Sequence, residues 1–133
     1  MKSILFITGR VIISLYFFIP GILKFFFWSS HVQLMETHNM PMVPQLLALA
    51  GTTQMLAGIA LFFGRYTVTA CIFLGILVVL INFNLHDFWN DYEGINSTHE
   101  AQNFIKNLGI LAGLSLLASI SINNTGSKEF PEK

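Results

Sequence analysis

Long apolar segments alternate with short polar ones along this chain. Four apolar stretches lie at about 4–28, 43–63, 66–86 and 103–122, and each is close to the roughly 20 residues that a membrane-spanning helix needs. Within each stretch, small and polar residues recur at the three- and four-residue spacing of one helical face. The pattern predicts an all-α fold, an integral membrane up-and-down four-helix bundle formed by one domain, residues 1–133, with 123–133 as a flexible cytoplasmic tail.

The composition indicates that a lipid bilayer is the main solvent of the chain. Hydrophobic residues make up 53% of the sequence and charged residues 11%, whereas soluble domains contain about 25% charged residues. A soluble core for four such segments would need a polar surface that this composition does not provide. The net charge is zero and there is no basic tract, so nucleic acid is excluded as a class of partner.

The few positive charges predict the orientation of the bundle. Outside the polar end described below, they occur at Lys2, Arg10, Arg65, Lys128 and Lys133. The connections at 29–41 and 87–102 contain no Lys or Arg. By the positive-inside rule, both termini and the turn at 64–65 are therefore predicted to be cytoplasmic. Arg10 has no acid in the cytoplasmic half of any helix, so we expect it to reach lipid headgroups or carbonyls at a helix end.

Polar side chains gather at the outward end of the predicted bundle. The candidate residues of a ligand pocket are Lys24, Gln54, Asn82, His86, Asp87, Glu100, Asn103, Lys106 and Asn107. All but Gln54, which lies midway along its segment, are in the outward half. Asn82 and His86 are one turn apart on one helix. Asn103 and Asn107 are one turn apart on the next, so all four can project together from facing helices. An unpaired ionisable group in hydrocarbon costs about 2.5 to 3.5 kcal/mol, and the acids at positions 87 and 100 are available to neutralise the two lysines.

This polar cluster has two interpretations. In the first, it is an outward-side pocket that hydrogen-bonds the carbonyl oxygens of an amphipathic ligand such as a quinone, and His86 carries protons. In the second, the side chains extend to water at the interface and hold helix ends together by ion pairs. The first predicts a membrane protein that binds such a ligand; combined with the family resemblance that follows, it implies a membrane subunit of a redox system that binds quinone or a small sulfur species beside a redox partner protein. The second predicts a non-enzymatic scaffold, a lipid-binding protein or a small transporter.

The sequence lacks the motifs of intrinsic cofactors and metals. Cys71 is the single cysteine, so dithiol chemistry within the chain is excluded, and we expect Cys71 to pack as a small hydrophobe. The four histidines have no short ligand spacing on one helix, so neither a metal nor a haem site is expected. No intrinsic cofactor is expected, quinone is the cofactor that the pocket interpretation allows, and no catalytic residue is assigned. Lipid-facing aromatic residues are compatible with a homo-oligomer.

Several motifs, taken together, resemble one family. They are Gly9-Arg10, Pro20-Gly21-x-x-Lys24, His86-Asp87-Phe88-Trp89, Asn103-Phe104-Ile105-Lys106-Asn107-Leu108 and Ala112-Gly113. In this combination, over about residues 4–120, the chain resembles the DoxX family of small bacterial membrane proteins. The resemblance implies a multi-pass four-helix protein of the bacterial inner membrane, similar to subunits associated with thiosulfate:quinone oxidoreductase activity. It also implies that Lys24, His86 and Lys106 are binding positions, with Asn103 and Asn107 lining the same pocket.

Overall fold

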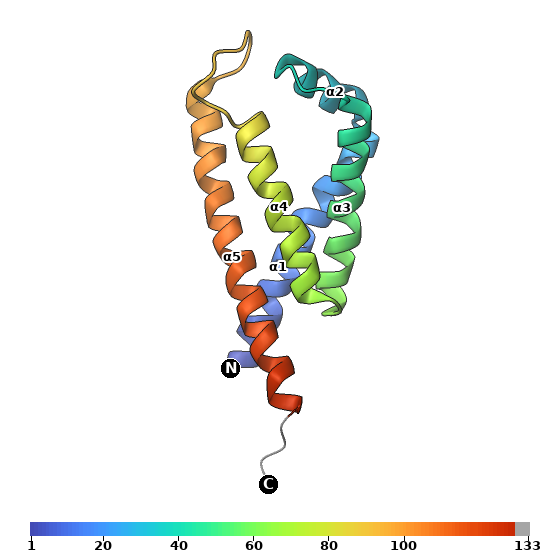
Figure 1. Ribbon diagram of the computed structural model, residues 1–133, viewed down its shortest axis with the longest axis vertical. Helices are drawn as coiled ribbons and strands as arrows, with labels where there is room; N and C mark the ends of the chain where they lie inside the picture. The colour runs from blue at the N-terminus through green and yellow to red at the C-terminus, as the bar shows by residue number, and fades with distance from the viewer. Residues whose placement is uncertain (130–133) are drawn as a thin grey trace.

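The computed structural model describes the backbone of residues 1–129 and the side chains of residues 1 and 3–123. This part of the chain contains no strand and folds into the helices α1 (Lys2–Phe26), α2 (Trp28–Thr37), α3 (Val43–Phe63), α4 (Thr67–Leu85) and α5 (Ser97–Glu129). Figure 1 shows the start of α1 and the α3–α4 turn at one end of the molecule, here called the Gly64 end. The opposite end, called the His86 end, carries α2 and the loop of residues 86–96.

Four helices are long and apolar enough to cross a bilayer. The candidate spans are Ser3–Phe26, Val43–Phe63, Thr67–Leu85 and Ser97–Asn123. Large apolar side chains on these helices are exposed, among them Ile12, Leu56, Phe73 and Leu116. In water, such an apolar surface would be far larger than that of a soluble monomer, whereas lipid tails cover it without cost. The prediction of an all-α membrane protein with four spans is therefore confirmed, and the cytoplasmic position of the termini stays a prediction.

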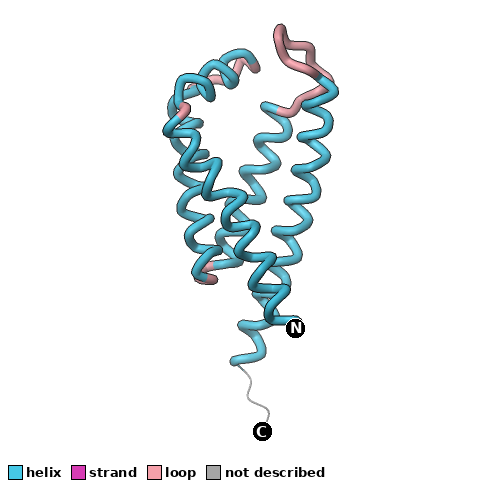
Figure 2. The backbone as a smooth tube through the Cα atoms, turned by 180° about the vertical axis from the view of Figure 1, so that it is seen from behind, coloured by secondary structure: helices cyan, strands magenta, loops and turns pink. Residues whose placement is uncertain are grey.

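The bundle consists of two antiparallel helix pairs. α1 packs along α3, and α4 packs along α5, while the α3–α4 contact joins the two pairs (Figures 1 and 2). α1 and α3 approach closely at Gly58, where an added Cβ would lie 2.9 Å from Cβ of Phe18 and 3.1 Å from its backbone nitrogen. At the same level, Oγ of Ser14 donates a hydrogen bond of 2.8 Å to the carbonyl of Gly58. Small residues at such crossings let backbones pack by van der Waals contact inside a membrane.

The main apolar core lies in the half of the bundle nearer the Gly64 end. All four long helices contribute to it, through Phe17, Ala57, Leu61, Ala70, Cys71, Leu74, Val78, Leu114 and Leu117. A second, smaller cluster at the His86 end consists of Met35, Val43 and Leu47, with Trp28, Val32 and Leu85 packed against it. The four spans are thus tied together by apolar contacts in one half, and the other half depends on different contacts, described below.

The connection at 29–41, predicted as a loop, mostly folds into α2. The prediction was wrong here because Trp28, Val32 and Met35, spaced by four and three residues, form one apolar helical face. Met35 is buried against Val43 and Leu47 of α3. Ser29, Ser30, Gln33 and Glu36 of α2 are exposed, so the segment is an amphipathic helix. Figure 1 shows it at the His86 end.

The last helix is longer than predicted at both ends. α5 begins at Ser97 rather than at 103, because the side-chain oxygen of Asn96 accepts a hydrogen bond of 3.1 Å from the backbone nitrogen of His99. Such an N-cap satisfies a backbone donor that the first turn leaves free. At the other end, α5 continues to Glu129 through most of the segment assigned to the tail. Residues 130–133 lie outside the described residues, and the flexibility of the tail stays a prediction.

Gly64 closes the turn between α3 and α4 at a position that excludes a side chain. Its φ is +68°, and an added Cβ would lie 2.0 Å from Nη1 of Arg10. We expect Gly64→Ala to lower the free energy of unfolding by about 2 kcal/mol through backbone strain alone, with a further loss because the guanidinium must move. Denaturant titration in mixed micelles measures the change.

Gly94→Ala is the matched control for this substitution. Gly94 has a φ of +77°, and no atom lies within 4 Å of its added Cβ, so the variant has the backbone strain without the collision. Equal losses in the two variants would show that the contact between Arg10 and the turn has no energetic effect.

Candidate functional site

An amide bridge joins α4 to α5 towards the His86 end of the spans. Asn82 is buried on α4, and its Nδ2 donates a hydrogen bond of 3.1 Å to the carbonyl of Phe104. Nδ2 of Asn107 donates a second bond of 2.8 Å to Oδ1 of Asn82. A buried amide without partners would be costly in a membrane, so these bonds explain why a polar residue is tolerated at position 82 and fix α4 against α5.

One turn closer to the His86 end, a histidine and a carboxylate form a second bridge. His86 follows the last residue of α4, Glu100 lies in the first turn of α5, and Nδ1 of the imidazole is hydrogen-bonded to Oε2 of the carboxylate. The two side chains are 21% and 14% exposed, so the pair is accessible from outside the bundle. Because an ionised carboxylate can only accept, Nδ1 carries the proton. Nε2 is therefore the nitrogen that is available to a ligand.

Asp87 is the centre of a buried cluster between α2 and the loop of residues 86–96. Its Oδ2 accepts hydrogen bonds of 2.7 Å from Nδ2 of Asn90 and 2.7 Å from the hydroxyl of Tyr92. Its Oδ1 lies 3.8 Å from Nε2 of His38, and the two side chains are 7% and 0% exposed. The rings of His38 and Tyr92 are also in contact, with centroids 4.5 Å apart. This cluster connects the end of α2 to the loop that leads into α5.

The hydrogen bonds of His38 define the chemistry of this cluster. Its Nδ1 lies 2.9 Å from the carbonyl of Leu34, and since a carbonyl only accepts, Nδ1 carries a proton. In the neutral ring, Nε2 is then an acceptor that faces Oδ1 of Asp87, and neither atom has a hydrogen-bond partner among the described residues. One proton placed on Nε2 converts two facing acceptors into an ion pair. The hydrogen bond to Asp87, together with burial and the negative charge of that carboxylate, raises the pKa of Tyr92.

Sequence reasoning missed His38, Asn90 and Tyr92 as members of this cluster. The prediction placed His38 in a loop, and two loops far apart in the sequence show no pattern that would pair them. The available signal was local. Asp87 and Asn90 are three residues apart after a helix end, a spacing typical of turns held by an Asp side chain.

The structure brings together part of the predicted site. Asn82 meets Asn107, and His86 meets Glu100, as described above. Asn103 is partly buried on α5 without a hydrogen bond to a described residue, and Lys106 is exposed. The side chain of Lys106 lies on a different face of α5 from that of Asn107, because successive residues on a helix are rotated by about 100°.

Lys24 and Gln54 lie on the other helix pair. Lys24 is partly buried on α1, and Gln54 is buried on α3, where its Oε1 has no partner among the described residues. The expectation that the acids at 87 and 100 neutralise the two lysines was wrong. Each of these acids faces a histidine instead, because the loop of residues 86–96 meets His38 at the end of α2 and Glu100 lies within the first turn of α5.

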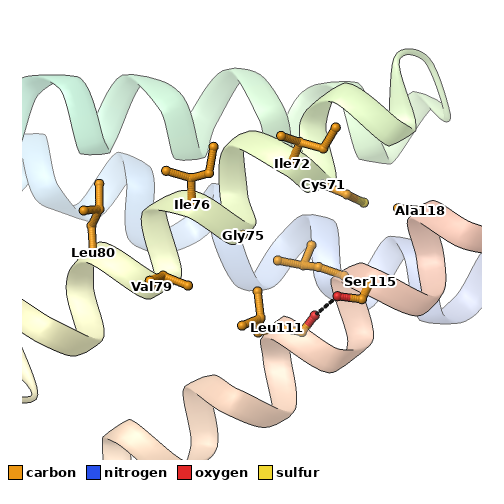
Figure 3. Close-up of a pocket in the computed structure, with 10 residues that line it drawn as sticks. Cys71, Ile72, Gly75, Ile76, Val79, Leu80, Leu111, Ser115 and Ala118 are labelled. Atoms are coloured by element: carbon orange, nitrogen blue, oxygen red, sulfur yellow. Dashed lines mark hydrogen bonds between the residues drawn. The ribbon is translucent and has the colours of Figure 1, made fainter.

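An apolar groove runs between α4 and α5 from the level of the amide bridge towards the Gly64 end. Its volume is about 400 Å³, and its lining includes Cys71, Gly75, Leu80, Leu111, Ser115 and Ala118. Figure 3 shows these side chains on the two facing helices. The hydroxyl of Ser115 donates to the carbonyl of Leu111 at 2.9 Å, so it is satisfied within its own helix. The groove therefore offers an apolar ligand a surface with little hydrogen-bonding demand, and the Asn82–Asn107 bridge follows one turn beyond it.

Metal-ligating residues do not gather anywhere in the described part of the chain. Among these residues there is no group of three or more His, Cys, Asp or Glu side chains that could hold a metal ion. Cys71 is a buried free thiol in the main core. The chemistry of the site is thus that of amides, an oriented imidazole and carboxylates.

Comparison with known proteins adds the family. The sequence profile of the DoxX family matches residues 5–87, which is more than half of the 133 residues. The matched region runs from α1 to Asp87 and includes Lys24, Gln54, Asn82 and His86, while α5 lies outside it. No curated protein and no solved structure matches the chain. Because the match extends over most of the membrane-spanning part, the chain belongs to the DoxX family of membrane proteins.

Proposed function

We propose that this protein is a membrane subunit of a redox system and that it binds a quinone between α4 and α5. The observation that supports this most directly is the arrangement of two features along one helix pair. An apolar groove of about 400 Å³ is followed by the Asn82–Asn107 bridge and then by the accessible His86–Glu100 pair. A quinone has an apolar part and a polar part in the same order, an apolar tail followed by a ring with two carbonyl oxygens.

In this proposal the tail lies in the groove and the ring lies at the His86–Glu100 pair. Burial of apolar surface contributes less in lipid than in water, so the tail is held mainly by van der Waals contact with the groove. The ring is positioned by hydrogen bonds. The Asn82–Asn107 bridge limits how far the ring can enter between α4 and α5. The two side-chain amides are already hydrogen-bonded to each other and to the carbonyl of Phe104, so they do not bind the ring.

His86 is the group that exchanges a proton with the ring. Glu100 orients the imidazole through its hydrogen bond with Nδ1, so that Nε2 is directed at the ring. When the bound quinol is oxidised, it loses two electrons and two protons. Nε2 of His86 accepts one proton from a hydroxyl of the quinol, and water at the exposed side accepts the other. A redox partner protein takes both electrons, in line with the redox systems to which DoxX proteins are often linked.

The test is the amount of quinone that copurifies with the full chain, measured by mass spectrometry of an organic extract. We expect His86→Ala and Glu100→Gln each to reduce retained quinol about tenfold, because the first removes the Nε2 acceptor of a quinol hydroxyl and the second removes the carboxylate that orients the imidazole. His99→Ala is the matched control, since His99 is exposed near the same end. Retention that is the same in all three variants would contradict the proposal.

A second candidate function is a non-enzymatic lipid-binding scaffold or small transporter. The observation that favours it is that most polar groups near the His86 end are satisfied by one another, as in the bonds of Asp87 to Asn90 and Tyr92. Structural polar groups behave in this way. Under this function the extract contains phospholipid without quinone. In liposomes, a transporter would let a small solute pass without added quinone, whereas a scaffold would let none pass.

A further inference from the structure

We propose that Arg10 and Arg65 bind the phosphate of an anionic phospholipid at the Gly64 end, with one acyl chain in the adjacent groove between α1 and α3. This site is at the opposite end of the molecule from the proposed quinone site and does not depend on it. Four observations support it, taken in turn below.

Arg10 is held in one place by packing. Its guanidinium lies against the α3–α4 turn, where a Cβ added to Gly64 would be 2.0 Å from Nη1 and 2.7 Å from Cζ. Its Cζ also lies 5.8 Å from the ring centroid of Phe6 on its own helix. The side chain therefore does not extend freely into solvent, and its donors are presented in a defined direction.

The donors of this guanidinium have no acceptor within the described part of the chain. An arginine side chain has five N–H donors in a planar arrangement, yet none of those of Arg10 is hydrogen-bonded to a described residue, and Nε is buried without a partner. The expected capping of helix-end carbonyls is thus not what the structure shows. A planar set of unused donors is suited to bidentate binding of phosphate oxygens.

The positive charge at this end is not neutralised by the described residues. Arg65 follows Gly64 and is exposed, so the turn itself carries a second positive charge beside that of Arg10. Carboxylates among the described side chains are all at the His86 end, at Glu36, Asp87, Asp91, Glu93 and Glu100. An anion at the turn is therefore attracted by two cations and repelled by none of these acids.

An apolar groove begins one turn from Arg10, and this favours a lipid over a free anion. Its volume is about 230 Å³, and it is lined by Ser14, Leu15, Phe18, Ile59, Phe62 and Phe63. Ser14 is four residues after Arg10, and Phe63 directly precedes Gly64, so the groove and the guanidinium are neighbours. The only polar side chain in this lining, Ser14, donates to the carbonyl of Gly58. An acyl chain can pack against this apolar surface, whereas inorganic phosphate gains no favourable contact from it.

The experiment is native mass spectrometry of the full chain in detergent, titrated in parallel with phosphatidylglycerol, phosphatidylcholine and sodium phosphate. We expect phosphatidylglycerol to bind more tightly than phosphatidylcholine, and Arg10→Gln to weaken its binding about fivefold, the usual contribution of one basic residue at an anionic membrane surface. Lys106→Gln is the matched control, because it removes one positive charge from an exposed position outside the Gly64 end.

Arg65→Gln keeps the test decisive if Arg10→Gln does not fold, because Arg65 is exposed and a substitution there leaves the packing unchanged. We expect it to weaken phosphatidylglycerol binding by a similar factor. Equal lipid binding in the arginine variants and Lys106→Gln would overturn the proposal. Sodium phosphate that binds as tightly as phosphatidylglycerol would also overturn it, since the site would then recognise a free anion.

Discussion

Asp87→Ala is expected to lower the free energy of unfolding by about 3 kcal/mol, because removing one member of a buried charged cluster leaves its partners unpaired. The substitution removes the acceptor of the 2.7 Å bonds from Asn90 and Tyr92. It also leaves the fully buried ring of His38 without the carboxylate that faces it. Denaturant titration in mixed micelles measures the loss. Asp91→Ala, at an exposed position in the same loop, is expected to have an effect close to zero.

Tyr92 provides a second readout of the same cluster. Since the hydrogen bond to Asp87 raises its pKa in the folded protein, this bond stabilises the fold below the ordinary pKa of tyrosine, near 10. The stabilisation is lost as the pH rises through the raised value. The ultraviolet absorbance of phenolate should therefore appear at a lower pH in Asp87→Asn than in the wild type. An unchanged titration would mean that, for the protein in solution, the hydroxyl of Tyr92 does not donate a hydrogen bond to Asp87.

Gly58→Ala is expected to destabilise the protein by about 2 kcal/mol, although alanine is the better helix former. An added Cβ would lie 2.9 Å from Cβ of Phe18 and 3.2 Å from its Cα. Backbone atoms cannot rotate away as a flexible side chain can, so α1 and α3 must separate. The separation also strains the hydrogen bond from Ser14 to the carbonyl of Gly58. Thermal unfolding in detergent, followed by circular dichroism, measures the effect.

Gly109→Ala is the matched control for this helix crossing. Gly109 is exposed on α5, and no atom lies within 4 Å of its added Cβ. There the helix propensity of alanine acts alone, so we expect a gain in stability of about 0.5 to 1 kcal/mol. The two substitutions thus have opposite expected signs. A gain in both would mean that α1 and α3 do not pack as closely as the structure shows.

Long-range contacts explain why the candidate site was predicted only in part. The sequence placed His86 and Asn82 on one helix and Asn107 on the next, and adjacent antiparallel helices do bring them together. Glu100 was assigned to a loop and to a lysine partner, whereas the Asn96 cap extends α5 and aligns the carboxylate with His86. A helical periodicity defines which face a residue occupies, but it does not define which partner lies opposite that face.

The sequence by itself determined that this is an all-α protein with four membrane spans. In lipid, a backbone must satisfy its own hydrogen bonds, and a helix does so within one segment, so the length and composition of each apolar segment are enough to predict a spanning helix. It also determined that its polar chemistry gathers at the end that carries His86. Only the tertiary structure decided that Asp87 meets His38, that Lys24 and Gln54 belong to the other helix pair, and that Arg10 rests on Gly64. These contacts join residues that are far apart in the chain, and they depend on which helices pair and how the loops cross the bundle ends, which local patterns do not encode.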